Sequence, residues 1–188
     1  IFRSRVFTRT SIGLRPSASH RRRSARVASR TALKAVRLRL EDSAGSFSRL
    51  GEAMISRHGI QGSLVYHASR MIREQITRDG EAVLYWDLVP DRTQESVQAA
   101  LSRPRGKDSL SNYLRKRLGI TGVKLALLYE LAPGAAQDPR RIAQVVKRLP
   151  QTVRSARPLD EAISTAGGIR LNELTPALML VKRPGVFC

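Results

Sequence analysis

Hydrophobic side chains alternate with polar ones in several stretches of the chain, which predicts β-strands. The clearest alternation spans residues 82–89, where Leu84 and Trp86 share one face and Val83 and Tyr85 share the other. Further extended stretches are predicted at residues 32–40, 51–56, 151–154, 168–171 and 178–181. Strands are therefore expected near both ends of the folded body.

Apolar residues three and four positions apart predict five helices between these strands. The longest covers residues 63–78 and follows a loop with two glycines, for which Ser63 is the expected N-cap. The four shorter helices are expected at residues 93–102, 109–118, 121–131 and 139–149. Because helices are inserted between an opening and a closing set of strands, we predict an α+β fold and not an alternating βαβ series.

The first thirty-one residues show no sustained periodicity and have an unusual composition. They contain nine Arg and six Ser, but no Lys and no acidic residue. Such a segment is typical of an organelle transit peptide, of a basic arm that binds phosphate groups, or of a GC-rich gene read in the wrong frame. We favour the last interpretation, in which residues 1–31 are non-native, and under all three we expect a largely disordered basic segment.

Charge and cysteine content narrow the class of protein. Of the formal net charge of +19, residues 1–40 carry +12, so the rest of the chain is only modestly basic. Hydrophobic residues make up 41% of the chain, which is enough for a core, and no apolar run approaches the about 18 residues of a membrane-spanning helix. One cysteine and three histidines without ligand spacing predict no metal site. We expect a cytoplasmic, bacterial protein that does not enter a membrane.

Several motifs in a fixed order carry a more specific signal than any one of them alone. They are H-G-I-Q-G-S-L-V-Y at 58–66, W-D-L-V-P-D-R at 86–92, S-L-S-N-Y-L-R-K-R-L-G at 109–119, D-E-A-x-x-T-A-G-G at 160–168 and P-G-V-F-C at 184–188. In combination they resemble the aminoacetone-oxidase-like (BaiN-like) family of FAD-dependent flavoproteins. The resemblance covers about residues 32–188, as an internal fragment of such an NAD(P)/FAD-dependent oxidoreductase.

The resemblance implies a small β-barrel-like inserted domain that is interrupted by a helical subdomain and lacks the FAD-binding Rossmann core. Its β-rich part would comprise residues 32–62, 80–91 and 151–188, and its helical part residues 63–79 and 92–150. No G-x-G-x-x-G follows a strand, so the family's pyrophosphate site has no equivalent here. We therefore expect the fragment alone to bind no FAD, to be inactive and to self-associate through exposed contact surface, whereas the complete enzyme would bind FAD and a small-molecule substrate.

Two glycine-containing turns are the candidate sites. By resemblance the first would lie against the flavin in the complete enzyme, and its residues are Thr165, Gly167 and Gly168. The second would face the flavin ring from the substrate side, and its residues are His58, Gly59, Gly62 and Ser63. Both turns could instead serve only to reverse the chain, because glycine suits tight turns without any ligand. His58 could donate a proton, although an idle surface histidine is also compatible with the sequence.

A nucleic-acid-binding protein is the alternative function. The predicted helices within residues 109–131 are separated by a short glycine-containing turn, like a helix-turn-helix. Their basic residues are Arg115, Lys116, Arg117 and Lys124. The solvated face of two packed helices has the same appearance, and no aromatic platform for bases accompanies them. We therefore consider nucleic acid an unlikely partner, and we assign no chemistry to Cys188.

Overall fold

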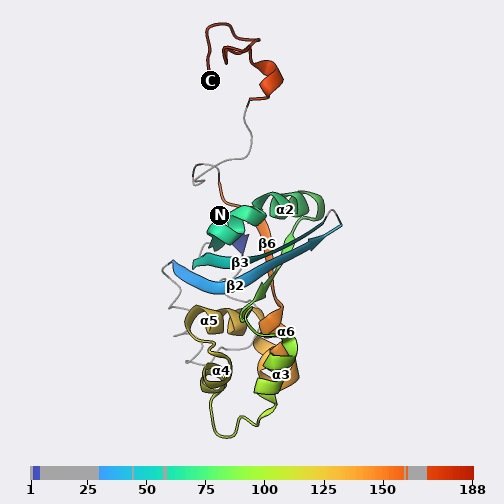
Figure 1. Cartoon of the computed structure of the whole chain (residues 1–188), viewed down its shortest axis with the longest axis vertical. Coiled ribbons are helices and arrows are strands. Elements are labelled where there is room, and N and C mark those ends of the chain that lie inside the picture. Colours follow the sequence, from blue (N-terminus) through green and yellow to red (C-terminus); the bar gives the residue numbers. More distant parts are fainter. Residues whose placement is uncertain (1, 5–29, 44, 57–58, 159, 161–168) are drawn as a thin grey trace, which may run out of the picture. The chain divides into compact units, whose positions relative to one another are not determined.

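The computed structural model describes residues 2–4, 30–43, 45–56, 59–158, 160 and 169–188 (Figure 1). The chain divides into two compact units, Ile1–Arg157 and Pro158–Cys188, and each is described by itself.

An antiparallel, strongly curled sheet is the centre of the first unit. Five of its strands lie in the order β4-β3-β2-β5-β6, and a short sixth strand, β1, pairs with both β4 and β6 and closes the barrel. The strands are β1 (Phe2–Ser4), β2 (Thr31–Asp42), β3 (Gly45–Ser56), β4 (Gly59–Gln61), β5 (Ala82–Asp87) and β6 (Leu149–Ala156). With the inserted helices, this barrel confirms the predicted α+β fold.

The helices lie on two different sides of the barrel (Figure 1). α2 packs against β2–β6, whereas α3–α6 pack on one another and against the ends of β2, β5 and β6. Their bounds are α2 (Ser63–Asp79), α3 (Gln94–Ser102), α4 (Leu110–Leu118), α5 (Gly122–Leu131) and α6 (Pro139–Lys147), with a 3₁₀ turn at Pro133–Gln137. The family resemblance had placed residues 63–79 in the helical subdomain, whereas in the structure α2 packs on the strands.

Part of the segment that was expected to be disordered is ordered. Phe2–Ser4 forms β1, and β2 already begins at Thr31. Backbone pairing explains this difference, because an extended segment of almost any composition can hydrogen-bond to two open strand edges. Residues 5–29 lie outside the described residues.

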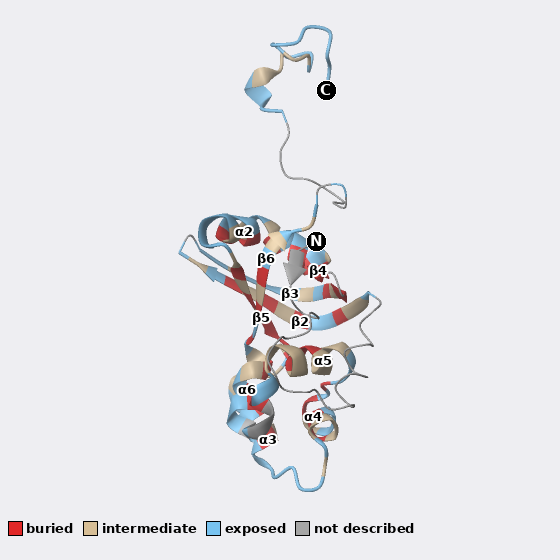
Figure 2. Ribbon diagram, turned by 180° about the vertical axis from the view of Figure 1, so that it is seen from behind, coloured by how far each residue is buried: buried red, intermediate tan, exposed pale blue. Residues whose placement is uncertain are grey.

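The barrel interior is apolar, as the alternating pattern predicts (Figure 2). In β5, Leu84 and Trp86 are fully buried, and the Trp86 indole Nε1 donates a hydrogen bond to Gln151 Oε1 on the neighbouring strand β6. This hydrogen bond satisfies the indole N–H of Trp86 and the side-chain oxygen of Gln151, so the large indole is compatible with the core. In the neighbouring strand β2, a bulge interrupts the alternation between Leu33 and Val36.

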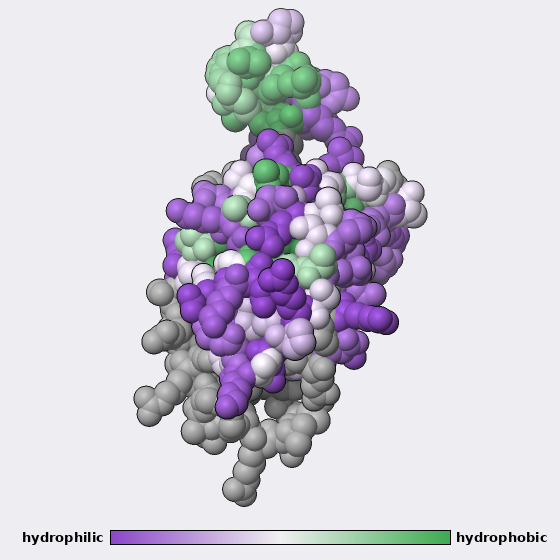
Figure 3. Space-filling view, turned by 60° about the horizontal axis from the view of Figure 1, so that its bottom comes forward, coloured by the Kyte–Doolittle hydropathy of each residue, from purple (hydrophilic) through white to green (hydrophobic). Residues whose placement is uncertain are grey.

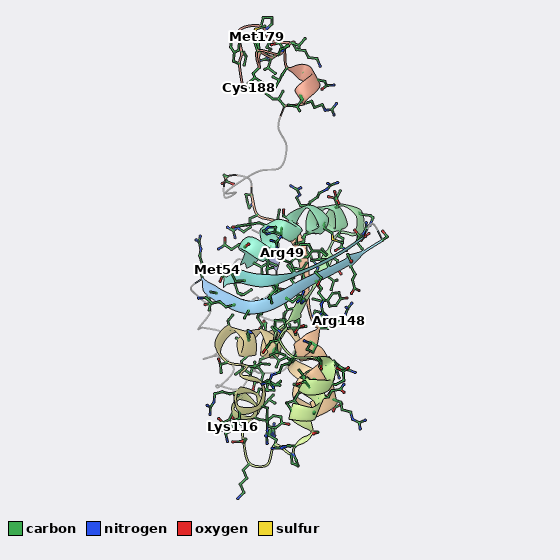
Figure 4. The ribbon with its side chains drawn as sticks, viewed as in Figure 1. Arg49, Met54, Lys116, Arg148, Met179 and Cys188 are labelled. Carbon is green, nitrogen blue, oxygen red and sulfur yellow. The ribbon has the colours of Figure 1, made fainter. Side chains whose placement is uncertain are left out.

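A surface ion pair connects the start of β6 to β2. Arg148 makes a bidentate contact with the Glu41 carboxylate, at 2.7 Å for each N–O pair, and its guanidinium carbon lies 3.9 Å from the centroid of the Tyr85 ring. The hydrogen bonds from Arg148 lower the pKa of Glu41. Figure 4 labels Arg148 at this side of the barrel.

The second unit is small and contains little regular structure. Its described residues include a 3₁₀ turn, Leu171–Glu173, and isolated bridges that join Leu174 to Leu180 and Met179 to Phe187. Residues 168–171 and 178–181 were expected to be extended strands. The structure instead starts a 3₁₀ turn at Leu171 and gives Leu178 a φ of +59°, so no regular strand forms in the described parts of these stretches, 169–171 and 178–181.

Many apolar side chains of this unit face solvent. Figure 3 shows them as a green surface. The exposed ones are Ile169, Leu171, Leu178, Val181, Val186 and Phe187, with Leu171 85% exposed. The free thiol of Cys188 is exposed as well. Among the described helices of the whole chain, none is long and apolar enough to cross a membrane.

Candidate functional site

The turn from β4 into α2 contains three of the predicted substrate-side residues. Gly59 begins β4 with a φ of +135°, Gly62 is the N-cap of α2 with a φ of +102°, and Ser63 is the first helical residue. The prediction that Ser63 is the N-cap is wrong, because Gly62 occupies that position and no side chain caps the helix. Only glycine adopts the backbone conformation of Gly62 without strain.

Gly62 is also pressed against the neighbouring strand β3. A Cβ atom at this position would lie 3.2 Å from the backbone nitrogen of Met54 and 3.3 Å from the Cα of Ala53. Both are backbone atoms and cannot turn aside as a flexible side chain would. Figure 4 labels Met54 on this strand. The close approach fixes the first turn of α2 at the edge of the barrel.

Gly62→Ala should lower the free energy of unfolding by about 1–3 kcal/mol, because the variant combines an unfavourable φ with the close backbone contact. Ser63→Ala is the matched control in the next position and should change stability by less than about 0.5 kcal/mol, since Ser63 is exposed and makes no capping bond. Urea denaturation followed by circular dichroism measures both. Equal effects of the two variants would contradict this description of the turn.

The first turn of α2 is electrostatically suited to an electron-rich group. It carries no acidic residue and its N–H groups have no side-chain cap, so the positive end of the helix dipole is not neutralised. The neighbouring polar side chains are turned to the backbone: Ser56 Oγ donates to Gly59 O at 3.3 Å, and the His67 Nδ1 lies 2.7 Å from Ser63 O. An oxygen or nitrogen lone pair in front of this turn would be stabilised.

The other predicted site residues are not placed by the structure. His58 lies outside the described residues, and so do Thr165, Gly167 and Gly168. Their roles stay predictions. Among the described residues, no cluster of His, Cys, Asp and Glu could hold a metal ion.

A buried charge cluster that was not predicted from the sequence lies at the end of β5. The Asp87 carboxylate is 1% exposed and lies 2.8 Å from Lys147 Nζ of α6 and 3.3 Å from Arg39 Nη2 of β2. It also accepts a hydrogen bond from the backbone N–H of Val89 at 3.2 Å. The signal in the sequence was a charged residue within a predicted apolar strand, in the W-D-L-V-P-D-R motif.

Two lysines hold the loop after Asp87 to the helical layer. Lys147 Nζ also donates to the carbonyl oxygens of Val89 and Arg92, and Lys124 Nζ of α5 donates to Leu88 O at 2.6 Å and Ala35 O at 2.9 Å. Burial lowers the pKa of Lys124. The W-D-L-V-P-D-R motif therefore connects the barrel to the helices, and this structural role accounts for its residues without a bound ligand.

The geometry of α4 and α5 bears on the nucleic-acid alternative. The two helices and the turn at Gly119 form as predicted, with Ser109 capping α4 through the Asn112 N–H. Lys124, however, is directed to backbone carbonyls inside the domain, and Lys116 is paired with Asp108 at 3.0 Å. Figure 4 labels Lys116 on α4. Two of the four cations that suggested a helix-turn-helix therefore serve structural contacts.

The closed antiparallel barrel, with α2 on one side and the layer α3–α6 on another, defines the chain as an α+β barrel domain with appended helices. The family model described as "HI0933-like protein barrel and H2TH domain" matches residues 24–164, well over half of the chain. The chain therefore belongs to the HI0933-like family, whose barrel and H2TH domain is part of flavoprotein-type oxidoreductases. Comparison with curated protein sequences gave no match.

This match confirms the predicted resemblance at the level of the family, while the particular member stays a prediction. It also begins at residue 24, within the segment 1–31 that we interpreted as non-native. The family sequence thus extends at least a few residues further toward the N-terminus than the motifs suggested.

Proposed function

We propose that the chain is the inserted, substrate-side domain of an FAD-dependent oxidoreductase, and that the turn Gly59–Ser63 faces the flavin ring in the complete enzyme. The observation that carries this proposal is the family match over residues 24–164. The turn supports it, because a glycine-rich approach with uncapped helix N–H groups suits close contact with a polar aromatic ring. In the same proposal, Thr165, Gly167 and Gly168 approach the flavin from the return segment.

The described residues fit one side of such a cofactor and not the whole of it. The turn before α2 offers backbone N–H groups without a side-chain cap to the electron-rich edge of a ring. A pyrophosphate needs a strand, a glycine-rich turn and a helix in immediate succession, and the chain contains no such G-x-G-x-x-G motif. When bound, FAD supplies the redox chemistry itself.

The residues of this chain would then position the substrate and tune the ring. The N–H groups of the first turn of α2 would stabilise negative charge at the ring edge, because the helix dipole is positive there. Gly62 keeps this turn close to β3 and so limits its freedom to move away from the ring. The exposed Ser63 side chain would lie at the border of the substrate space.

A charge substitution at Ser63 tests whether the turn faces the flavin. In the complete flavoenzyme, Ser63→Asp should lower the midpoint reduction potential of the flavin by about 30 mV or more, a change of about 1.4 kcal/mol for a two-electron couple. The physical reason is that a carboxylate beside the ring disfavours the electron-rich reduced form. Spectroelectrochemical titration measures the potential.

Ser63→Asn is the matched control, because its side chain has the same size and no charge, and it should shift the potential by only a few millivolts. Asp at the first position of a helix is well tolerated, so both variants should fold. An unchanged potential in the folded Ser63→Asp enzyme would place the turn away from the flavin and contradict the proposal.

A further inference from the structure

The five strands β2–β6 do not close the barrel by themselves. In the order β4-β3-β2-β5-β6 the two outermost strands, β4 and β6, are not paired with each other. The interior behind this gap is apolar, since Ile60 of β4 and Val153 of β6 are both fully buried. Without another strand, backbone N–H and C=O groups at both edges would lack partners next to a hydrophobic core, which is unfavourable.

The gap is occupied by β1. Phe2 pairs with Ile60 of β4 on one side and with Ala156 of β6 on the other, and the pairing with β6 continues through Arg3 with Ser155. Both pairings are antiparallel, and a register shift follows between Arg3 and Ser4. A segment of three residues therefore bridges two edges at once.

The segment that closes the barrel does not belong to the part of the chain that matches the family. The match begins at residue 24, whereas β1 ends at Ser4. Pairing of a segment outside the match with both edges is expected if the edges recognise the extended main chain and not a family-specific sequence. Strand addition works in this way, because the hydrogen bonds come from the backbone and the side chains contribute only selectivity.

We propose that the gap between β4 and β6 is a strand-acceptor site, which binds a short extended segment of polypeptide antiparallel to both edges. Its occupant in this chain is Phe2–Ser4, bound within the same molecule. The site requires free backbone N–H groups in the ligand and tolerates changes of its side chains. A free peptide with the sequence of residues 1–6 can therefore take the place of the N-terminal segment.

Two substitutions at one position separate main-chain from side-chain recognition in the full chain. Arg3→Pro removes the N–H of the residue that pairs with Ser155, while Arg3→Ala keeps it. Amide hydrogen exchange, followed by NMR, should be accelerated at least about tenfold at Ile60 and Ser155 in Arg3→Pro, and should stay within about twofold of the parent in Arg3→Ala. Unchanged exchange in Arg3→Pro would overturn the proposal, and equal acceleration in both variants would show that a side chain is recognised instead.

Truncation tests whether the site accepts a separate ligand. The chain without residues 1–23 should show shifted amide resonances at Ile60 and Ser155 when the peptide of residues 1–6 is added, and no shifts with the same peptide carrying Arg3→Pro. If the truncated chain does not fold alone, refolding in the presence of the parent peptide, and not of the proline peptide, gives the same information. No response to either peptide would overturn the acceptor site. If the full chain forms a dimer that is lost when residues 1–23 are removed, a second copy of the chain supplies the strand, and the proposal that the strand is bound within the same molecule is overturned.

Discussion

Asp87→Asn should lower the free energy of unfolding by about 3–5 kcal/mol, because it leaves a buried cation without its anion. Lys147 is only 12% exposed and its ammonium lies 2.8 Å from the Asp87 carboxylate, while Arg39 approaches the same oxygen at 3.3 Å. Asparagine can still accept the Val89 N–H, so the substitution removes mainly the charge. Urea denaturation at neutral pH measures the loss.

Asp108→Asn is the matched control for this prediction. Its partner Lys116 is 52% exposed, so the loss of that pair should cost less than about 1 kcal/mol. The double variant Asp87→Asn with Lys147→Met should be clearly less destabilised than the sum of the single variants, because the two groups interact directly. If Asp87→Asn and Asp108→Asn lowered the free energy of unfolding by similar amounts, the buried cluster would not stabilise the contact between the barrel and the helices.

Trp86→Ala should lower the free energy of unfolding by about 3–5 kcal/mol, because it opens a cavity in the barrel interior. The indole is fully buried, and its removal also deprives the buried Gln151 Oε1 of the hydrogen bond from Nε1. The expected result is a large fall in the urea midpoint, or a chain that no longer folds at physiological temperature.

One control separates the cavity from the hydrogen bond, and a second compares the buried ring with an exposed one. Trp86→Phe keeps much of the volume and should cost less than Trp86→Ala, whereas Tyr66→Ala on α2 removes an aromatic ring that is 43% exposed and should cost about 1 kcal/mol or less. If Trp86→Ala were no worse than Tyr66→Ala, the buried face assigned to β5 would be incorrect.

Secondary structure was predicted correctly from the sequence where a local periodic pattern of apolar residues determines the element. The alternation around Trp86 predicted β5 and the division of its side chains between two faces, and the spacing of apolar residues in 109–118 predicted α4. The position of α2 was not predicted, because an amphipathic helix shows which face is buried but not whether a sheet or other helices cover it. β1 was missed because its stability comes from pairing with two distant edges, which local composition does not reveal.

The candidate site was predicted only in part for a related reason. The glycines of the β4–α2 turn were visible in the sequence, but the assignment of the cap to Ser63 was wrong, since serine is the more usual cap and the close approach of Gly62 to β3 is a tertiary contact. The cluster around Asp87 combines residues from β2, β5 and α6, which are far apart in the chain. Spacing within one motif could not show that Lys147 and Asp87 are partners.

Flavin content tests the central claim most directly. We would purify this 188-residue chain and the longer polypeptide of which we propose it is a domain, and compare their visible spectra and bound FAD. The chain alone should be colourless, and the longer protein should carry FAD in stoichiometric amount, because the chain lacks the G-x-G-x-x-G motif that binds the pyrophosphate of a dinucleotide. A yellow 188-residue chain with stoichiometric FAD, or a longer protein with no flavin, would contradict the account.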